Sequence, residues 1–183
     1  MTDQELYALK YPIGEFIKPD KIDATVLYTW INDLEQFPKT LVSLTKDLTI
    51  DQLHWTYRPG GWNIKQVVHH CADSHINSII RFKLALTEDI PTIRPYHEDR
   101  WAKLIDCNDN NLDDTILLLK GLHAKLCNLL RSLTAEDLAK QFTHPDHENR
   151  VRLDENIGIY AWHSNHHLAH IRQALEHKGQ FDT

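Results

Sequence analysis

The feature that most constrains this chain is a cluster of histidines near its C-terminus. Within residues 160–171, four histidines fall in a span of eight positions: His163, His166, His167 and His170. On a helix they form two pairs, His163/His167 and His166/His170, because residues four apart lie on the same face. Two imidazoles stacked in this way can bind one metal ion. A third ligand then has to come from another segment, which the fold must bring against this helix.

Composition limits the classes of protein to which the chain can belong. Its 183 residues, 42% hydrophobic and 25% charged, fit one soluble globular domain with a real core. The formal net charge of -6 and the absence of a basic run argue against nucleic acid or an anionic membrane as partner. No apolar stretch approaches the roughly 18 residues that span a bilayer. An acidic N-terminus and three cysteines without C-x-x-C spacing favour a reducing, cytoplasmic location.

The spacing of apolar residues predicts four long helices, because such residues recur at steps of three and four. The helices are expected at about residues 22–46, 64–86, 112–133 and 154–178. Asn63 is a suitable N-cap for the second, and Gly179 a suitable stop after the last. Pro38 falls inside the first and is expected to kink it or to start a new helix. Thr49 and Thr134 are N-cap candidates for two additional short helices.

The segments between these helices are expected to be irregular. Residues 1–22 contain two prolines and a glycine, which predicts an irregular arm that packs through Tyr11, Ile13 and Phe16. Residues 88–110 form a long connection, and connections of this length are often functional. Residues 142–153 could be a small hairpin or a loop.

These elements predict the fold class. Four long helices without strong strand alternation indicate an all-α, antiparallel four-helix bundle. It is expected to form a single domain over residues 1–183, with its core at about 22–178.

A second histidine group supplies candidates for the third ligand. Residues 67–75 read Val-Val-His-His-Cys-Ala-Asp-Ser-His, so the second helix offers His69, His70 and His75. His70 lies near the apolar stripe, three residues after Val67, and the other two lie at its flanks. An inward-facing histidine is more often a hydrogen-bonded core residue than a ligand, but two helices that both carry histidines favour a shared site. Three neutral imidazoles would leave an open position on the metal, as in catalytic zinc sites.

Several motifs resemble those of a known family, the YfiT branch of the DinB-like superfamily. The resemblance covers roughly residues 20–175 and rests on these segments: Arg58-Pro-Gly-Gly-Trp62, Val67–His75, Arg81–Glu88, Leu153–Asn156 and Tyr160–Ile171. It implies a four-helix bundle, a homodimer, and a divalent metal held by His70, His163 and His167. Zinc or nickel is the expected metal, and iron or manganese would also suit such a site.

The resemblance also implies an activity. Members of this branch are described as metal-dependent hydrolases or bacillithiol S-transferases. The expected function is transfer of a low-molecular-weight thiol to an electrophile, with hydrolysis by metal-activated water as the alternative. A small-molecule thiol and an electrophile are therefore the expected partners.

Four polar residues near the implied ligands are candidates for supporting roles. Asp73, three residues after His70, could orient an imidazole through a hydrogen bond, or it could be a solvated or intrahelical side chain. Asn77 is a candidate for the pocket mouth. His166 and His170 lie about 100° further round the helix than the implied ligands, so they could support those ligands or face a dimer partner.

Two further side chains are candidates for the pocket itself, and one cysteine is a candidate nucleophile. Arg81 could hold a substrate carboxylate through two hydrogen bonds, although an arginine in a structural ion pair is the commoner case. Trp62 follows two glycines and is a candidate for the pocket wall. Cys71 points about 100° away from His70 on a helix, which makes a Cys/His nucleophile a weak interpretation.

A protein of another class is the competing interpretation. In a non-catalytic metal-binding or stress-related module, the ion would mainly tie two helices together. A fourth protein ligand, for example His75 or Glu155, would favour that role, whereas three ligands facing a cleft would favour catalysis. A bundle without any metal is the remaining alternative.

Overall fold

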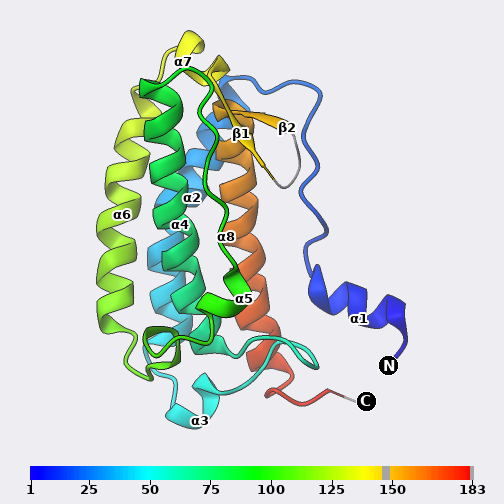
Figure 1. Cartoon of the computed structure of the whole chain (residues 1–183). Helices are drawn as coiled ribbons and strands as arrows, with labels where there is room; N and C mark the ends of the chain where they lie inside the picture. Colours follow the sequence, from blue (N-terminus) through cyan, green and yellow to red (C-terminus); the bar gives the residue numbers. More distant parts are fainter. Residues whose placement is uncertain (146–148, 182–183) are drawn as a thin grey trace.

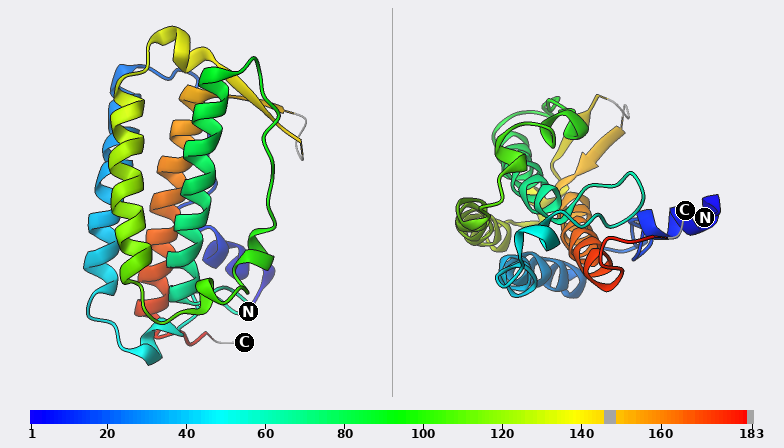
Figure 2. Two further views of the ribbon diagram at one scale, coloured as in Figure 1. Left: turned by 60° about the vertical axis from the view of Figure 1, so that its left-hand side comes forward. Right: turned by 90° about the horizontal axis from the view of Figure 1, so that it is seen from below.

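Four long helices pack side by side in the structure, a computed structural model that describes residues 1–145 and 149–181 (Figure 1). They are α2 (Ala24–Thr45), α4 (Ile64–Thr87), α6 (Asp113–Arg131) and α8 (Leu153–Glu176). Each of α2 and α4 packs against both α6 and α8, and the end-on view in Figure 2 shows this arrangement. The expected four-helix bundle is therefore confirmed. None of the helices in the described residues is long and apolar enough to cross a membrane.

The direction of the helices explains the long connection. In Figure 1, α2 and α8 run downward, whereas α4 and α6 both run upward. The chain must therefore return along the whole bundle between α4 and α6. This return segment carries the short helices α5 (Glu98–Trp101) and η1 (Asp106–Asn108). As a result, α4 is antiparallel to α8 and parallel to α6, and the return segment lies along one side of the bundle (Figure 2).

The N-caps expected from the sequence are present. The Asn63 side chain accepts a hydrogen bond from the Gln66 backbone N–H at 3.0 Å, and the Gln66 side chain accepts one from the Asn63 N–H at 3.1 Å. Thr49 and Thr134 form the same reciprocal arrangement before α3 (Ile50–Leu53) and α7 (Ala135–Ala139). Each cap satisfies backbone donors that a helix cannot pair internally, which fixes where these helices begin.

The N-terminal arm differs from the expectation. It begins with a helix, α1 (Asp3–Lys10), which Thr2 and Glu5 cap reciprocally. The prolines and the glycine that argued for an irregular arm come after this helix, so they shape only the second half of the segment. Phe16 packs near Trp30, with ring centroids 6.3 Å apart, but Ile13 is 46% exposed and does not anchor the arm.

Pro38 does not divide the first long helix. Helix α2 continues through it to Thr45, so the expectation that a new helix starts there is wrong. Proline has no N–H and cannot donate to the carbonyl four residues earlier, that of Leu34. A side chain makes up the loss, because Nδ1 of His123 on α6 lies 2.6 Å from the Leu34 carbonyl oxygen.

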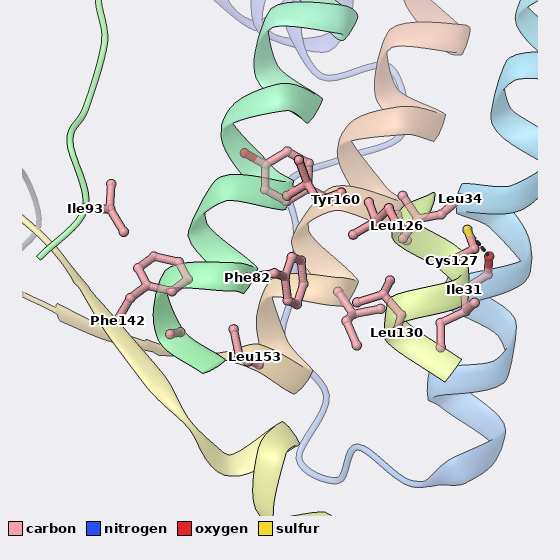
Figure 3. Close-up of a cluster of buried hydrophobic side chains, with 14 residues drawn as sticks. Ile31, Leu34, Phe82, Ile93, Leu126, Cys127, Leu130, Phe142, Leu153 and Tyr160 are labelled. Carbon is pink, nitrogen blue, oxygen red and sulfur yellow. Dashed lines mark hydrogen bonds between the residues drawn. The ribbon is translucent and has the colours of Figure 1, made fainter. Parts of the chain in front are cut away.

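The segment after α7 forms the hairpin that the sequence left open. Strands β1 (Gln141–His144) and β2 (Asn149–Arg152) are antiparallel, with Phe142 opposite Val151. The part of the expected hairpin or loop at residues 146–148 lies outside the described residues. Phe142 is buried and attaches the hairpin to the apolar cluster at the upper end of the bundle in Figure 1. Ile93 of the return segment also packs there (Figure 3).

Two apolar clusters fill the bundle, one toward each end. The upper one, shown in Figure 3, includes Leu34, Phe82, Leu126 and Leu153. The lower one includes these residues: Phe37, Leu41, Val68, Leu119 and Ile171. Between them, α4, α6 and α8 contribute buried polar side chains, among them these four: His75, Ser78, His123 and Ser164. The bundle thus contains a polar layer across its middle, enclosed by hydrophobic packing on both sides.

Two glycines in long helices provide a test of this packing. A Cβ at Gly158 of α8 would lie 2.7–2.8 Å from ring atoms of Trp30 on α2, whereas one at Gly121 of α6 would meet nothing within 4 Å. Gly158→Ala should lower the free energy of unfolding by about 1–3 kcal/mol through overpacking. Gly121→Ala should raise it by about 0.5–1 kcal/mol, because alanine favours the helix. Thermal or urea unfolding measures both, and equal shifts of the same sign would contradict the close α2–α8 contact.

Candidate metal centre

Three imidazoles meet in the polar layer, from His70 on α4 and from His163 and His167 on α8. One nitrogen of each lies within 4.8 Å of the others. Nε2 of His163 lies 3.3 Å from Nε2 of His70 and 3.2 Å from Nε2 of His167. Two imidazole nitrogens bound to one tetrahedral zinc ion at about 2.0–2.1 Å lie about 3.3 Å apart. The spacing of the nitrogens therefore fits a single divalent ion.

Burial keeps these imidazoles in the form that binds metal. Loss of hydration lowers the pKa of His70 to about 4, with a smaller contribution from the nearby His166. Burial likewise holds the pKa values of His163 and His167 well below their usual range. Each side chain is therefore neutral near pH 7, and a neutral imidazole has one unprotonated nitrogen for a metal.

The donor set leaves room for other ligands. Among the described residues, no carboxylate or thiol belongs to the group of three histidines. The two candidates for a fourth ligand are engaged elsewhere, since Glu155 forms an ion pair with Lys18 at 2.7 Å and Nε2 of His75 lies 3.1 Å from Nδ1 of His163. This arrangement matches an open, catalytic site more closely than a closed, structural one.

The three histidines face a cavity of about 580 Å³ between α4, α8 and the return segment. Aromatic side chains form much of its wall: Tyr11, Tyr57, Trp62, Tyr96 and Tyr160. The Trp62 ring centroid lies 4.6 Å from that of His70, so the loop before α4 covers the His70 imidazole from one side. The return segment contributes Tyr96 and Glu98, which gives this long connection a place at the site.

The remaining histidines of the two clusters occupy distinct positions. His75 contacts Nδ1 of His163, and Nδ1 of His170 lies 3.3 Å from Nδ1 of His167. The His166 ring stacks on Trp162, with centroids 4.5 Å apart, and lines the cavity without joining the group of three. Spacing alone left open which of the two pairs on α8 belongs to the site. In the structure, His163 and His167 are the pair that faces His70.

His69 points away from this site toward α6. Its Nδ1 lies 2.8 Å from the Thr115 hydroxyl, and its Nε2 lies 3.1 Å from the Asp109 carbonyl oxygen. His69 therefore joins α4 to the start of α6.

Two candidates from the sequence lie elsewhere. Asp73 does not orient an imidazole of the group, because its carboxylate accepts a hydrogen bond from the Cys107 thiol at 3.4 Å. Asn77 is not at the pocket mouth, because its side-chain amide donates to the Asp73 carbonyl at 2.8 Å, one turn earlier in α4. Both side chains turn toward the return segment or their own helix, which a position on a helical face does not reveal.

Arg81 faces the cavity, as the sequence suggested. Its Nη1 lies 3.4 Å from the Tyr160 hydroxyl, and its buried Nε has no hydrogen-bond partner. Arg81 forms no ion pair within the described residues. The alternative role of Arg81, a structural ion pair, is therefore absent from the described residues.

The three cysteines are unsuited to nucleophilic chemistry. Cys71, Cys107 and Cys127 are all buried and free. Burial raises the pKa of the Cys71 thiol far above its usual range and that of Cys107 to about 12. Neither forms a thiolate near neutral pH, so chemistry at this site depends on the histidines.

Comparison with known proteins agrees with the geometry. The sequence profile of the DinB superfamily matches residues 33–171. A protein of Oceanobacillus iheyensis is 45% identical over 169 residues, which cover 92% of this chain and 97% of the relative. A protein of Bacillus cereus strain AH820 is 50% identical over 163 residues, which cover 89% and 93%. Both carry the name "Putative metal-dependent hydrolase".

A solved structure is also closely similar. It is that of YfiT from Bacillus subtilis, described as a probable metal-dependent hydrolase with an unusual four-helix bundle topology. The TM-score is 0.91 at 42% sequence identity, over 95% of this chain and 99% of the other.

Proposed function

This chain belongs to the DinB superfamily, and from that premise we propose that it is a metal-dependent enzyme that transfers a small thiol to an electrophile. The observation that carries the proposal is the meeting of three neutral imidazole nitrogens at one face of a cavity, without an acidic ligand among the described residues. The names of the relatives support metal dependence and an enzymatic role.

The residues present fit a divalent ion. His70, His163 and His167 would hold it, and imidazole suits zinc, nickel and iron. A divalent metal bound there would lower the pKa of a thiol or a water molecule toward neutrality. The rest of the site is supplied by the chain, because aromatic side chains and the return segment form the wall around the reacting groups.

The acids near the site are not arranged as in zinc proteases. Zinc proteases of the H-E-x-x-H type use a glutamate beside the metal as the general base. Glu98 is the one carboxylate among the described residues that line this cavity, and its side chain is exposed on α5. A thiol with a lowered pKa needs no such base, because its proton passes to solvent at neutral pH. Metal-bound water with a lowered pKa shares this property, so hydrolysis stays the second candidate.

The proposed reaction is a substitution at carbon. The sulfur forms a bond to the electrophilic carbon, and the leaving group departs with the electron pair of its own bond. The thiol proton goes to solvent through the cavity mouth. Bacillithiol is the thiol implied by the family resemblance. Hydrolysis is the second candidate, and the names of the relatives are what favour it.

An assay with several thiols separates these candidates. The metal-loaded protein should accelerate the reaction of 1-chloro-2,4-dinitrobenzene with at least one of bacillithiol, cysteine, coenzyme A and glutathione. A chelator should abolish the acceleration, and added zinc or nickel should restore it. His163→Ala should react at the background rate. A metal-dependent rate with p-nitrophenyl acetate, and none with any thiol, would contradict thiol transfer and favour hydrolysis.

Arg81 indicates the charge of the substrate. Its guanidinium is only partly exposed, has an unpaired Nε and shares the cavity with His163. Arginine suits carboxylate and phosphate groups because its donors match their planar geometry. We propose that Arg81 binds an anionic group on the thiol or on its electrophile.

Kinetics of Arg81 variants test this role. Arg81→Gln should raise KM for a carboxylate-bearing thiol about tenfold, because a charge-assisted hydrogen bond contributes about 1.5–3 kcal/mol. Metal content should not change, and Arg81→Lys should have a smaller effect. Arg131→Gln is the matched control, since Arg131 pairs with Glu35 on the surface at 2.6 Å. An equal rise in KM for a neutral thiol such as 2-mercaptoethanol would contradict the assignment.

A further inference from the structure

We propose that His75, His123 and His170 form two hydrogen-bond relays that fix the tautomers and ring orientations of His163 and His167. Each relay begins at a backbone carbonyl and ends at an unprotonated Nε2 that faces the metal position. The inference rests on the proposed metal site, and it makes the three histidines positioning residues for the two ligands on α8.

The first relay begins at Leu34. Because Pro38 has no N–H, the Leu34 carbonyl receives no hydrogen bond from its own helix at that position. Nδ1 of His123 lies 2.6 Å from this oxygen. A carbonyl oxygen can only accept, so Nδ1 of His123 must carry the proton.

That assignment determines every later step of the relay. A neutral imidazole has one N–H, so Nε2 of His123 is an acceptor and receives the proton of His75 Nδ1, at 2.7 Å. Nε2 of His75 is then an acceptor for Nδ1–H of His163, at 3.1 Å. The only unprotonated nitrogen left on His163 is Nε2, which faces His70 and His167.

The surroundings keep this relay neutral and strengthen it. Burial lowers the pKa of His123, which does not contact the three-histidine group, to about 4. Phe37 packs on both rings, with centroids 5.1 Å from His123 and 5.3 Å from His75. Both rings are buried, and apolar clusters lie on both sides of the layer, which strengthens these hydrogen bonds.

The second relay begins at the end of α1. Lys10 is the last residue of that helix, where carbonyls have no partner within the helix. Nε2 of His170 lies 3.0 Å from the Lys10 carbonyl oxygen, so Nε2 carries the proton and Nδ1 accepts. Nδ1 of His167 lies 3.3 Å from Nδ1 of His170 and donates to it. Nε2 of His167 is therefore left unprotonated.

The two relays thus converge on one point. The Nε2 atoms of His163 and His167 lie 3.2 Å apart, and neither carries a proton that could join them. Two facing lone pairs repel each other, and a cation between them turns that repulsion into attraction. The relays therefore prepare both nitrogens as metal ligands before a metal binds, and the second relay connects α1 to the site.

Imidazole ¹⁵N NMR on the metal-free protein at pH 8 tests the tautomers directly. His75, His123, His163 and His167 should be protonated at Nδ1, and His170 at Nε2. Protonation of His163 or His167 at Nε2 in the wild type would overturn the proposal. This readout does not depend on metal binding, so it stands even if the proposed function fails.

Metal affinity tests the consequence. His123→Leu and His170→Leu should each weaken zinc binding about tenfold, in the range found when partners of metal ligands are removed. His123→Gln should recover most of the affinity, because its amide oxygen can accept the proton of His75 Nδ1. His69→Leu is the matched control, since it removes a buried histidine of α4 whose hydrogen-bond partners among the described residues are Thr115 and Asp109.

The outcomes separate a positioning role from a loss of stability. If His69→Leu loses as much thermal stability as His123→Leu but keeps wild-type zinc affinity, positioning is supported. Wild-type affinity in folded His123→Leu and His170→Leu would overturn the proposal. An equal loss of affinity in His69→Leu would overturn it as well.

Discussion

The structure depends on how a four-helix bundle buries imidazoles in its middle. An unpaired polar group in an apolar interior costs several kcal/mol, and such a group is therefore rarely left without a partner. Here His75, His123 and His170 link the imidazoles of His163 and His167 to two backbone carbonyls. The chain supplies those carbonyls at two places where a helix cannot use them, one turn before Pro38 in α2 and at the end of α1.

The directions of the helices explain why connecting segments lie at the site. Because α4 and α6 run in the same direction, the chain must return between them, and the return segment encloses the site with Tyr96 and Glu98 (Figure 1). The N-terminal arm closes the cavity from another side, where Tyr11 lies near His166 with ring centroids 5.8 Å apart. Segments that look like connections in the sequence therefore form part of the pocket wall.

Much of the fold could be predicted from the sequence, because apolar periodicity and capping residues act locally. The four long helices and the caps at Asn63, Thr49 and Thr134 depend on neighbours within a few positions. Helix α1 is not predicted from the sequence, because the prolines of the arm argue against a helix, although they follow the capped turn. The rule that proline breaks helices also failed at Pro38, where a distant histidine satisfies the freed carbonyl.

The site was only partly predictable, because its contacts join residues far apart in the chain. Spacing gave two equivalent pairs on α8, and the family resemblance distinguished them. His123 belongs to neither histidine cluster in the sequence, yet it lies four residues after Leu119 and three before Leu126, on the apolar stripe of α6. That position was the available signal. The direction of Asp73 toward Cys107 depends on the path of the return segment and has no such signal.

The most direct measurement is the metal content of untagged protein, determined by elemental analysis for the wild type, His163→Ala and His166→Ala. His163 and His166 each belong to a pair with the same spacing on α8, so they differ only in which way they face. Wild type and His166→Ala should bind about one divalent ion per chain, as expected for one three-histidine site, and His163→Ala should bind none. Full metal content in folded His163→Ala, or its loss in His166→Ala, would contradict the assignment of the centre.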